Sequence, residues 1–223
     1  MVGGAAKIVI NAREEILGRV RKALGRRPGE PIPPAPKIRL RIPELEREAQ
    51  VELFIQKFEI LGGKAFRAGD ASAVIPAIQH LLAQKSAIAS NAPFLRKCGI
   101  TGLPQVHAGF TDRDELKAAC AAADIGITSV DYALAATGSF VMLSSQSEAR
   151  LVSLSPPAHI AIFPRSLLLA NLAELLALVP RPADQTSSMV LITGPSRTAD
   201  IEQILVRGVH GPGEVYAVIV DEE

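Results

Sequence analysis

Short apolar runs alternate with stretches of helical periodicity from about residue 44 to residue 220 of this chain. The apolar runs predict strands over residues 64–67, 86–90, 125–130, 139–143, 159–163, 188–193 and 215–220. The intervening patterns predict helices over residues 44–61, 71–83, 111–123, 166–179 and 199–206, with a short helix after Pro93. Strands that alternate with helices are typical of a largely parallel sheet covered on both faces. We therefore expect an α/β fold, with residues 215–220 completing the sheet and no internal repeat.

The N-terminal region has a different pattern. Asn11 followed by Glu14 resembles a capping box, and Gly25 is suited to end a helix that carries one apolar stripe. This stripe consists of Ile16, Leu17, Val20 and Leu24. A proline-rich basic stretch follows, which favours an extended linker. The sequence thus predicts an arm over residues 1–43 and an α/β domain over residues 44–223. The arm helix packs either on its own domain or on another chain, and we expect the latter.

Composition excludes several classes of protein. The formal net charge is +1, aromatic residues make up 4% and tryptophan is absent, which disfavours nucleic-acid binding. The N-terminus lacks a long apolar run, and the apolar segment 167–179 is short and interrupted by Asn171 and Glu174. We therefore expect no membrane span, and a cytoplasmic location by elimination.

Metal and cofactor motifs are also missing. Cys98 and Cys120 are the only cysteines, so one chain cannot supply a four-thiolate zinc or iron–sulfur site, and both are expected to be buried thiols. The four histidines are scattered, and the glycine-rich signatures of nucleotide-binding loops are absent. We expect no cofactor and no stoichiometric metal, so the purified protein should be colourless.

The strongest motif is the run from Thr193 to Asp200, which follows an apolar strand and is expected to open the helix 199–206. A helix N-terminus at the carboxyl end of a strand offers free N–H groups to an anion. The candidate ligand-binding residues here are Gly194, Ser196, Arg197, Thr198 and Asp200. Arginine has a planar fork suited to carboxylate or phosphate. The alternative is that Thr198 only caps the helix and Asp200 only favours its first turn.

Two further segments add candidates. Thr137, Gly138 and Ser139 precede a strand, either as a tight turn or as a close backbone approach to a ligand. Arg150 follows the polar run 144–148, which reads as a solvated loop or as part of the site. His210 stands among three glycines, where it either exchanges protons with a substrate or bonds a loop carbonyl. A small anion is the expected ligand of all ten candidates.

These runs together resemble the lactate-utilisation (LUD) domain, and the overall length with its arm resembles the LutC/YkgG group of that family. The resemblance rests on Ala136–Ser139, Arg150, Pro157–Ile160, Gly194–Glu202 and Gly208–Pro212. It implies a three-layer α/β/α fold like that of the glucosamine-phosphate isomerase, ribose-phosphate isomerase and CoA-transferase group. It also implies a role in oxidising L-lactate to pyruvate beside two iron–sulfur partner proteins.

The resemblance leaves two classes of function open. The family often has glutamate before the Thr-Gly pair, where this chain has Ala136, and no obvious glutamate nucleophile stands in these loops. This departure favours an accessory subunit of a lactate-oxidising complex that binds a small carboxylate, with a homo-oligomer as a further possibility. The alternative is an autonomous enzyme acting on a sugar phosphate or an acyl-CoA. A titratable pair in a polar pocket would favour the enzyme.

Overall fold

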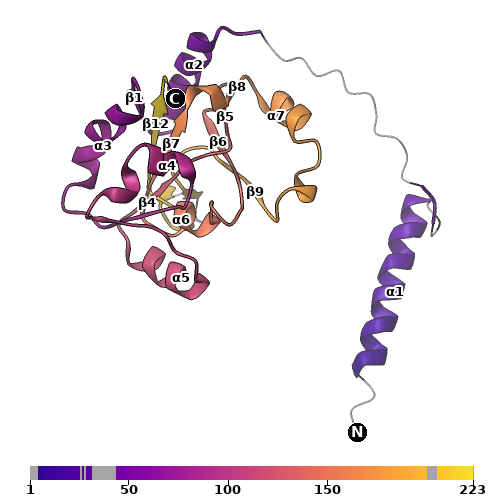
Figure 1. Ribbon diagram of the computed structural model, residues 1–223. Coiled ribbons are helices and arrows are strands. Elements are labelled where there is room, and N and C mark those ends of the chain that lie inside the picture. The colour runs from indigo at the N-terminus through magenta and orange to yellow at the C-terminus, as the bar shows by residue number, and fades with distance from the viewer. Residues whose placement is uncertain (1–4, 26, 28, 32–43, 200–204, 223) are drawn as a thin grey trace. The chain divides into compact units, whose positions relative to one another are not determined.

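The computed structural model describes residues 5–25, 27, 29–31, 44–199 and 205–222 (Figure 1). The chain divides into two compact units, Met1–Arg39 and Leu40–Glu223. The predicted boundary between residues 43 and 44 borders the range 32–43, which lies outside the described residues. Among the described residues, no helix combines the length and the apolar character that a membrane crossing requires.

The first unit contains helix α1, Ala5–Leu24. This helix begins upstream of Asn11, so the predicted capping box is wrong, whereas Gly25 follows its end with a φ of +64° as expected. Its apolar stripe is largely uncovered within the structure: Ile16, Val20 and Leu24 are 61%, 48% and 65% exposed.

The second unit contains the α/β fold. Its helices are α2 (Arg47–Ile60), α3 (Val74–Leu82), α4 (Pro93–Lys97), α5 (Arg113–Ala122), α6 (Arg150–Leu154) and α7 (Leu172–Leu178). Strands of its main sheet are β1 (Lys64–Ala68), β2 (Ala87–Ala89), β3 (Val106–His107), β4 (Ile125–Thr128), β7 (Ala158–Pro164) and β12 (Glu214–Val220). Short 3-10 helices are η1 (Ala71–Ala73), η2 (Ile100–Gly102), η3 (Arg165–Leu167) and η4 (Pro182–Asp184).

The main sheet has the order β1-β12-β7-β4-β2-β3, and all its pairs are parallel. Side chains alternate between two cores because successive residues of a strand face opposite sides. On β7, Ile160 and Ile162 pack with α3 and α4, while Ala161 and Phe163 pack with α2 and the second sheet. The sheet is therefore covered on both faces (Figure 1), which confirms the predicted three-layer α/β class. The predicted strand 215–220 lies inside this sheet, between β1 and β7.

A second sheet, which the sequence did not indicate, has the order β8-β5-β6-β9. Its strands are β5 (Tyr132–Leu134), β6 (Ser139–Leu143), β8 (Leu168–Leu169) and β9 (Met189–Ile192). β6 pairs antiparallel with both β5 and β9. The predicted strands 139–143 and 188–193 exist, but they belong to this sheet and not to the parallel one.

Two predicted helices differ from the structure. Residues 166–179 form a helix only from Leu172, because Leu168 and Leu169 pair with β5 and the Asn171 side chain caps α7. The predicted helix 199–206 is wrong where the structure describes it, at Ala199, Leu205 and Val206, which lie in strands. In its place β10 (Arg197–Ala199) and β11 (Leu205–Arg207) pair antiparallel, with residues 200–204 outside the description. Distant backbone partners decide this, since Ser196 N–H donates to Pro212 O at 2.8 Å and Gly208 N–H donates to Ser196 O at 3.0 Å.

Candidate functional site

The predicted segment 137–139 and the predicted loop after β9 lie together. The hydroxyl groups of Thr137 and Ser139 are hydrogen-bonded at 2.8 Å, and Ser139 is also hydrogen-bonded to the Thr193 hydroxyl at 2.8 Å. Ser139 is only 2% exposed. This hydroxyl chain joins the start of β6 to the end of β9, so Ser139, which makes both bonds, has a structural role here.

The glycines and the arginine of this cluster pack on the C-terminal end of α2. Gly138 has a φ of +60°, and a Cβ atom there would lie 2.4 Å from Phe58 N. Gly194 has a φ of +89° and faces Leu61 in the same way. The Arg197 guanidinium donates a hydrogen bond to the Leu61 carbonyl oxygen. These contacts favour the tight-turn interpretation of Gly138 and give Arg197 a role in holding α2.

The remaining candidates are divided between places. The backbone of Ser196 bonds the loop that contains His210, an exposed residue. Arg150 begins α6, and its Nη1 donates to Ser188 Oγ at 3.1 Å, away from this cluster. Asp200 lies outside the described residues, and of Thr198 the structure gives only the backbone pairing with Val206. Because Arg197–Ala199 form a strand, the expected helix N-terminus does not lie at these residues, and ligand binding by the ten residues stays a prediction.

A different place in the fold has the geometry expected of a ligand site. The chain leaves β2 toward α4 and β3 on one side, and it leaves the adjacent strand β4 toward the second sheet and β7 on the other. In open α/β sheets, ligands bind outside the carboxyl ends of two neighbouring strands whose connections diverge in this way. The segments that follow these two strands begin with Ser90 and Ser129.

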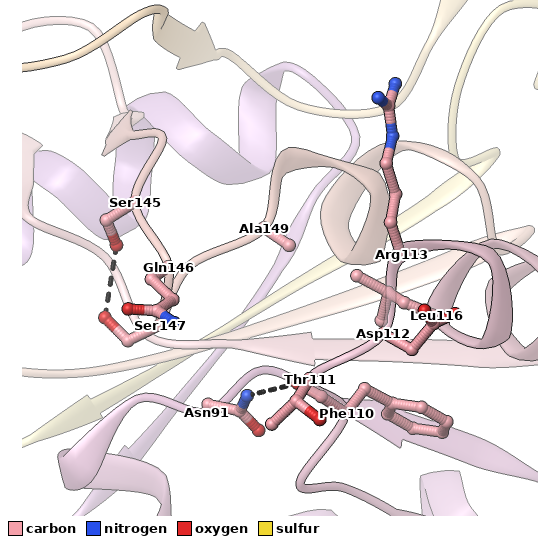
Figure 2. Close-up of a pocket in the computed structure, with 10 residues that line it drawn as sticks. All are labelled: Asn91, Phe110, Thr111, Asp112, Arg113, Leu116, Ser145, Gln146, Ser147 and Ala149. Atoms are coloured by element: carbon pink, nitrogen blue, oxygen red, sulfur yellow. Dashed lines mark hydrogen bonds between the residues drawn. The ribbon is translucent and has the colours of Figure 1, made fainter.

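A pocket of about 610 Å³ lies here, within the volume range of small-molecule sites. Its lining combines hydroxyl, amide and apolar side chains with one acid and one arginine. The lining residues are Asn91, Phe110, Thr111, Asp112, Arg113, Leu116, Ser145, Gln146, Ser147 and Ala149. Figure 2 shows the segment 145–147 facing Asn91 across the pocket, while the Arg113 guanidinium extends away from them. A second, small cavity of about 20 Å³ is lined by Ser90, and it shares Asn91, Phe110 and Gln146 with the pocket.

Two polar side chains shape the walls of this pocket. Asn91 Nδ2 donates to Phe110 O at 2.8 Å, and Asn91 Oδ1 accepts from Gly109 N at 3.0 Å. Asp112 caps α5 by accepting from the backbone N–H groups of Asp114 and Glu115. Both side chains therefore fix the segment before α5 opposite the loop 144–149.

Glu148 is the functional candidate that sequence reasoning missed. The sequence leaves the run 144–148 open as a solvated loop or as part of a site; in the structure Glu148 is 7% exposed, and its Oε1 accepts from Ser129 N at 3.0 Å. Glu148 Oε2 and the Ser90 hydroxyl are both buried; they make no hydrogen bond of good geometry among the described residues, but the two groups lie close enough for the Ser90 hydroxyl to lower the pKa of Glu148. Burial raises the pKa of Glu148 to about 8; the Ser90 hydroxyl and the hydrogen bond from Ser129 N–H oppose this rise, and the charge of Asp131 adds slightly to it. A serine-rich run gives no local signal of this burial, because distant strand ends impose it.

The buried carboxyl group should make stability depend on pH. Since the folded state raises the pKa of Glu148 to about 8, it keeps a proton that the unfolded state releases near the ordinary value of 4.5. Its stabilising contribution is complete below about pH 4.5 and is lost as pH rises toward 8. Between pH 5 and 7, Glu148→Gln should gain about 1.4 kcal/mol of unfolding free energy per pH unit relative to the wild type. Urea denaturation tests this, and parallel pH curves for the two proteins would contradict it.

Burial also shifts the pKa values of one histidine and two cysteines near the sheet, in each case toward the neutral form. Burial lowers the pKa of His159 to about 3, and its Nε2 is hydrogen-bonded to the Thr128 hydroxyl at 2.8 Å. Cys98 and Cys120 are free and buried as expected, in cores on opposite faces of the sheet, and burial raises the pKa of both thiols. In the part of the chain that the structure describes, no three acidic, histidine or cysteine side chains gather as a metal site.

Comparison with known proteins identifies relatives that match about two thirds of this chain. The chain is 36% identical over 157 residues to "Lactate utilization protein C" of Halalkalibacterium halodurans, covering 66% of this chain and 68% of the relative. It is 35% identical over 150 residues to "Lactate utilization protein C 1" of Bacillus mycoides, covering 62% of this chain and 64% of the relative.

A solved structure and a family model agree with these relatives. The crystal structure of a DUF162 family protein from Deinococcus radiodurans superposes with a TM-score of 0.61 at 18% identity, covering 79% of this chain and 99% of that one, which supports the fold. The family model of the LUD domain matches residues 51–220, a range that includes the main sheet, the second sheet and the pocket between β2 and β4. This match confirms the resemblance drawn from the motifs: the chain belongs to the LUD domain family.

Proposed function

We propose that this protein takes part in lactate utilisation as a subunit that binds a small carboxylate and carries no redox centre of its own. Relatives of this chain bear the name lactate utilization protein C, and the match extends over most of the α/β unit. The redox centres would then belong to iron–sulfur partner proteins. The two cysteines support this division, because they are buried on opposite faces of the sheet and cannot ligate one cluster together.

The proposal that this protein binds a ligand rests on the pocket at the diverging ends of β2 and β4. It is lined by hydroxyl and amide groups that can orient a carboxylate, and by the apolar side chains of Phe110 and Leu116. Its position is where parallel sheets usually bind ligands. Lactate and pyruvate, each with one carboxylate and one further oxygen, match this lining in chemistry and are far smaller than the pocket.

Thermal denaturation in the presence of pyruvate or L-lactate tests this site. Either ligand at 100 times its Kd should stabilise the wild type by about 2.7 kcal/mol. Gln146 is exposed at the pocket, so Gln146→Glu places a negative charge there without disturbing the core, and it should abolish the rise in melting temperature. Gln56→Glu makes the same charge change on the exposed face of α2 and is the matched control.

The same experiment separates the pocket from the loop after β9. Arg197→Ala should leave the ligand response intact, since Arg197 is bound to α2. A response that survives in Gln146→Glu and disappears in Arg197→Ala would place the ligand at the loop predicted from the sequence. A response to neither ligand in the wild type would contradict the proposed function.

The arm gives a test of the partners. The exposed stripe Ile16, Val20 and Leu24 is too apolar to remain in water by itself, and burying each side chain contributes roughly 1.5–3 kcal/mol. We predict that α1 packs on another chain, either a second copy or an iron–sulfur partner. Deletion of residues 1–43 should therefore reduce the number of chains per particle in solution, or the recovery of partners from lactate-grown cells. If the deletion lowers the stability but changes neither the number of chains per particle nor the recovery of partners, α1 packs on its own α/β unit.

One observation favours a second function. Glu148 has a raised pKa and stands between Ser147 and Ala149, which line the pocket, and a raised pKa is a property of many groups that exchange protons in enzymes. An autonomous enzyme acting on a sugar phosphate or an acyl-CoA is therefore the second candidate. If such a compound raises the melting temperature of the protein and the purified chain alone converts it, the enzyme is favoured over the accessory subunit.

A further inference from the structure

Phe110 lies at the border between two cavities. It lines the polar pocket at the ends of β2 and β4, and it also lines another cavity of about 350 Å³. This cavity, which we call the alanine groove, lies between α5 and the strands β2 and β3 at the edge of the main sheet. Its lining is mainly apolar and includes Ile88, Ala87, Ala119, Ala122 and Ala123. Phe110 is the only described residue that both linings contain.

The Phe110 side chain packs on an apolar cluster that adjoins both cavities. The cluster has Ile88, Cys120 and Val152 at its centre. Residues of both cavities pack against it as well: Leu116 and Ala149 from the pocket, and Ala119 and Ala123 from the alanine groove. Figure 2 shows the Phe110 ring pointing away from the segment 145–147. The ring therefore forms the apolar end of the pocket, opposite its polar wall.

The backbone beside this ring is held in place by Asn91. The Asn91 side chain accepts from Gly109 N and donates to Phe110 O, so it bonds the chain just before and just after the Phe110 side chain. Asn91 is itself anchored, because its backbone N–H donates to Ser147 O at 2.9 Å. These bonds tie the Phe110 backbone to the polar wall and keep its ring at the border of the two cavities.

We infer that Phe110 determines which carboxylates the proposed site accepts: its ring ends the pocket on the apolar side and limits the ligand to a short alkyl chain. This inference rests on the proposed function and names a residue that selects its ligand. The rest of the pocket wall is largely polar and exposed, as at Thr111, Ser145 and Gln146, so a longer alkyl chain has no apolar surface there on which to be buried. Removal of the ring would join the pocket to the alanine groove, which offers that surface.

Isothermal titration of the full chain with a series of 2-oxo acids tests this inference. Pyruvate, 2-oxobutanoate and 2-oxohexanoate share the carboxylate and the keto group and differ in chain length. The wild type should bind all three with affinities within about threefold of one another, because the added methylene groups stay in water. In Phe110→Ala, each methylene group that enters the groove should raise the affinity roughly fourfold. 2-Oxohexanoate should then bind at least about 20-fold more tightly than pyruvate.

Three further variants control this result. Phe94→Ala removes the same side chain from a partly buried position on α4, in the core on the other face of the sheet, and should keep the wild-type preference. Phe110→Ala combined with Ala122→Leu refills the groove from an exposed position of α5, and it should bring the three affinities back within about threefold. Phe110→Val is a milder truncation that should shift the preference in the same direction if the alanine variant does not fold.

The outcomes distinguish this inference from the proposed function. A folded Phe110→Ala or Phe110→Val with the wild-type preference overturns the inference. So does a gain that also appears in Phe94→Ala or that survives Ala122→Leu, and so does a wild type that already prefers 2-oxohexanoate by more than about tenfold. In each of these cases, pyruvate binding by the wild type still supports the proposed function. If the wild type binds none of the three acids, the proposed function and this inference are both wrong.

Discussion

Replacement of Phe140 by alanine is expected to lower the free energy of unfolding by about 3–5 kcal/mol, the cost of deleting a large buried ring. Phe140 is fully buried on β6. Its ring centroid lies 5.8 Å from that of Phe54, 5.2 Å from that of Phe58 and 5.9 Å from that of Phe163. These four rings come from the second sheet, from α2 and from the main sheet, so one substitution loosens three layers together.

Urea denaturation at a fixed pH measures this loss. Phe94→Ala is the matched control, because Phe94 is only partly buried on α4 and lies in the core on the other face of the main sheet. Its cost should be clearly smaller. A loss below about 1.5 kcal/mol for Phe140→Ala would show that the second sheet does not depend on this ring cluster.

Replacement of Gly126 by alanine should be comparably damaging for a different reason. A Cβ atom at Gly126 on β4 would lie 1.9 Å from the carbonyl oxygen of Val152 in α6. That oxygen belongs to the backbone and cannot turn aside, so α6 must shift, and the cost should reach or exceed the upper end of the roughly 1–3 kcal/mol typical of overpacking. Because α6 begins two residues after Glu148, the same variant should also weaken pyruvate binding.

Gly102, at the end of η2, supplies the control for this experiment. A Cβ atom at Gly102 would meet nothing within 4 Å, so Gly102→Ala should change stability by no more than about 0.5 kcal/mol. Both variants are compared by urea denaturation and by titration with pyruvate. If Gly126→Ala kept the stability of the wild type, α6 would not be clamped on β4 and the position of the loop 144–149 would need another explanation.

Local sequence determined much of the main fold. The apolar periodicity of α2, which buries Val51, Phe54 and Phe58, was readable from the chain. The run Ser139–Leu143 was predicted with the bounds that the strand has, and β7 and β12 were predicted within one residue at each end. These elements satisfy a local rule, since periodicity and turn residues report which side chains are buried wherever the partner lies.

Only the tertiary structure decided which strand pairs with which, and therefore where the candidate site lies. The segment after Gly194 looks like a helix start, yet backbone bonds from Ser196 to residues 208 and 212 make it part of a hairpin. Glu148 looks like a solvated residue of a serine-rich loop, yet the ends of two strands bury it. In both cases the partners are distant in sequence. Such partners set the backbone conformation of the first segment and, by burial, the pKa of Glu148. No local sequence pattern reports either effect.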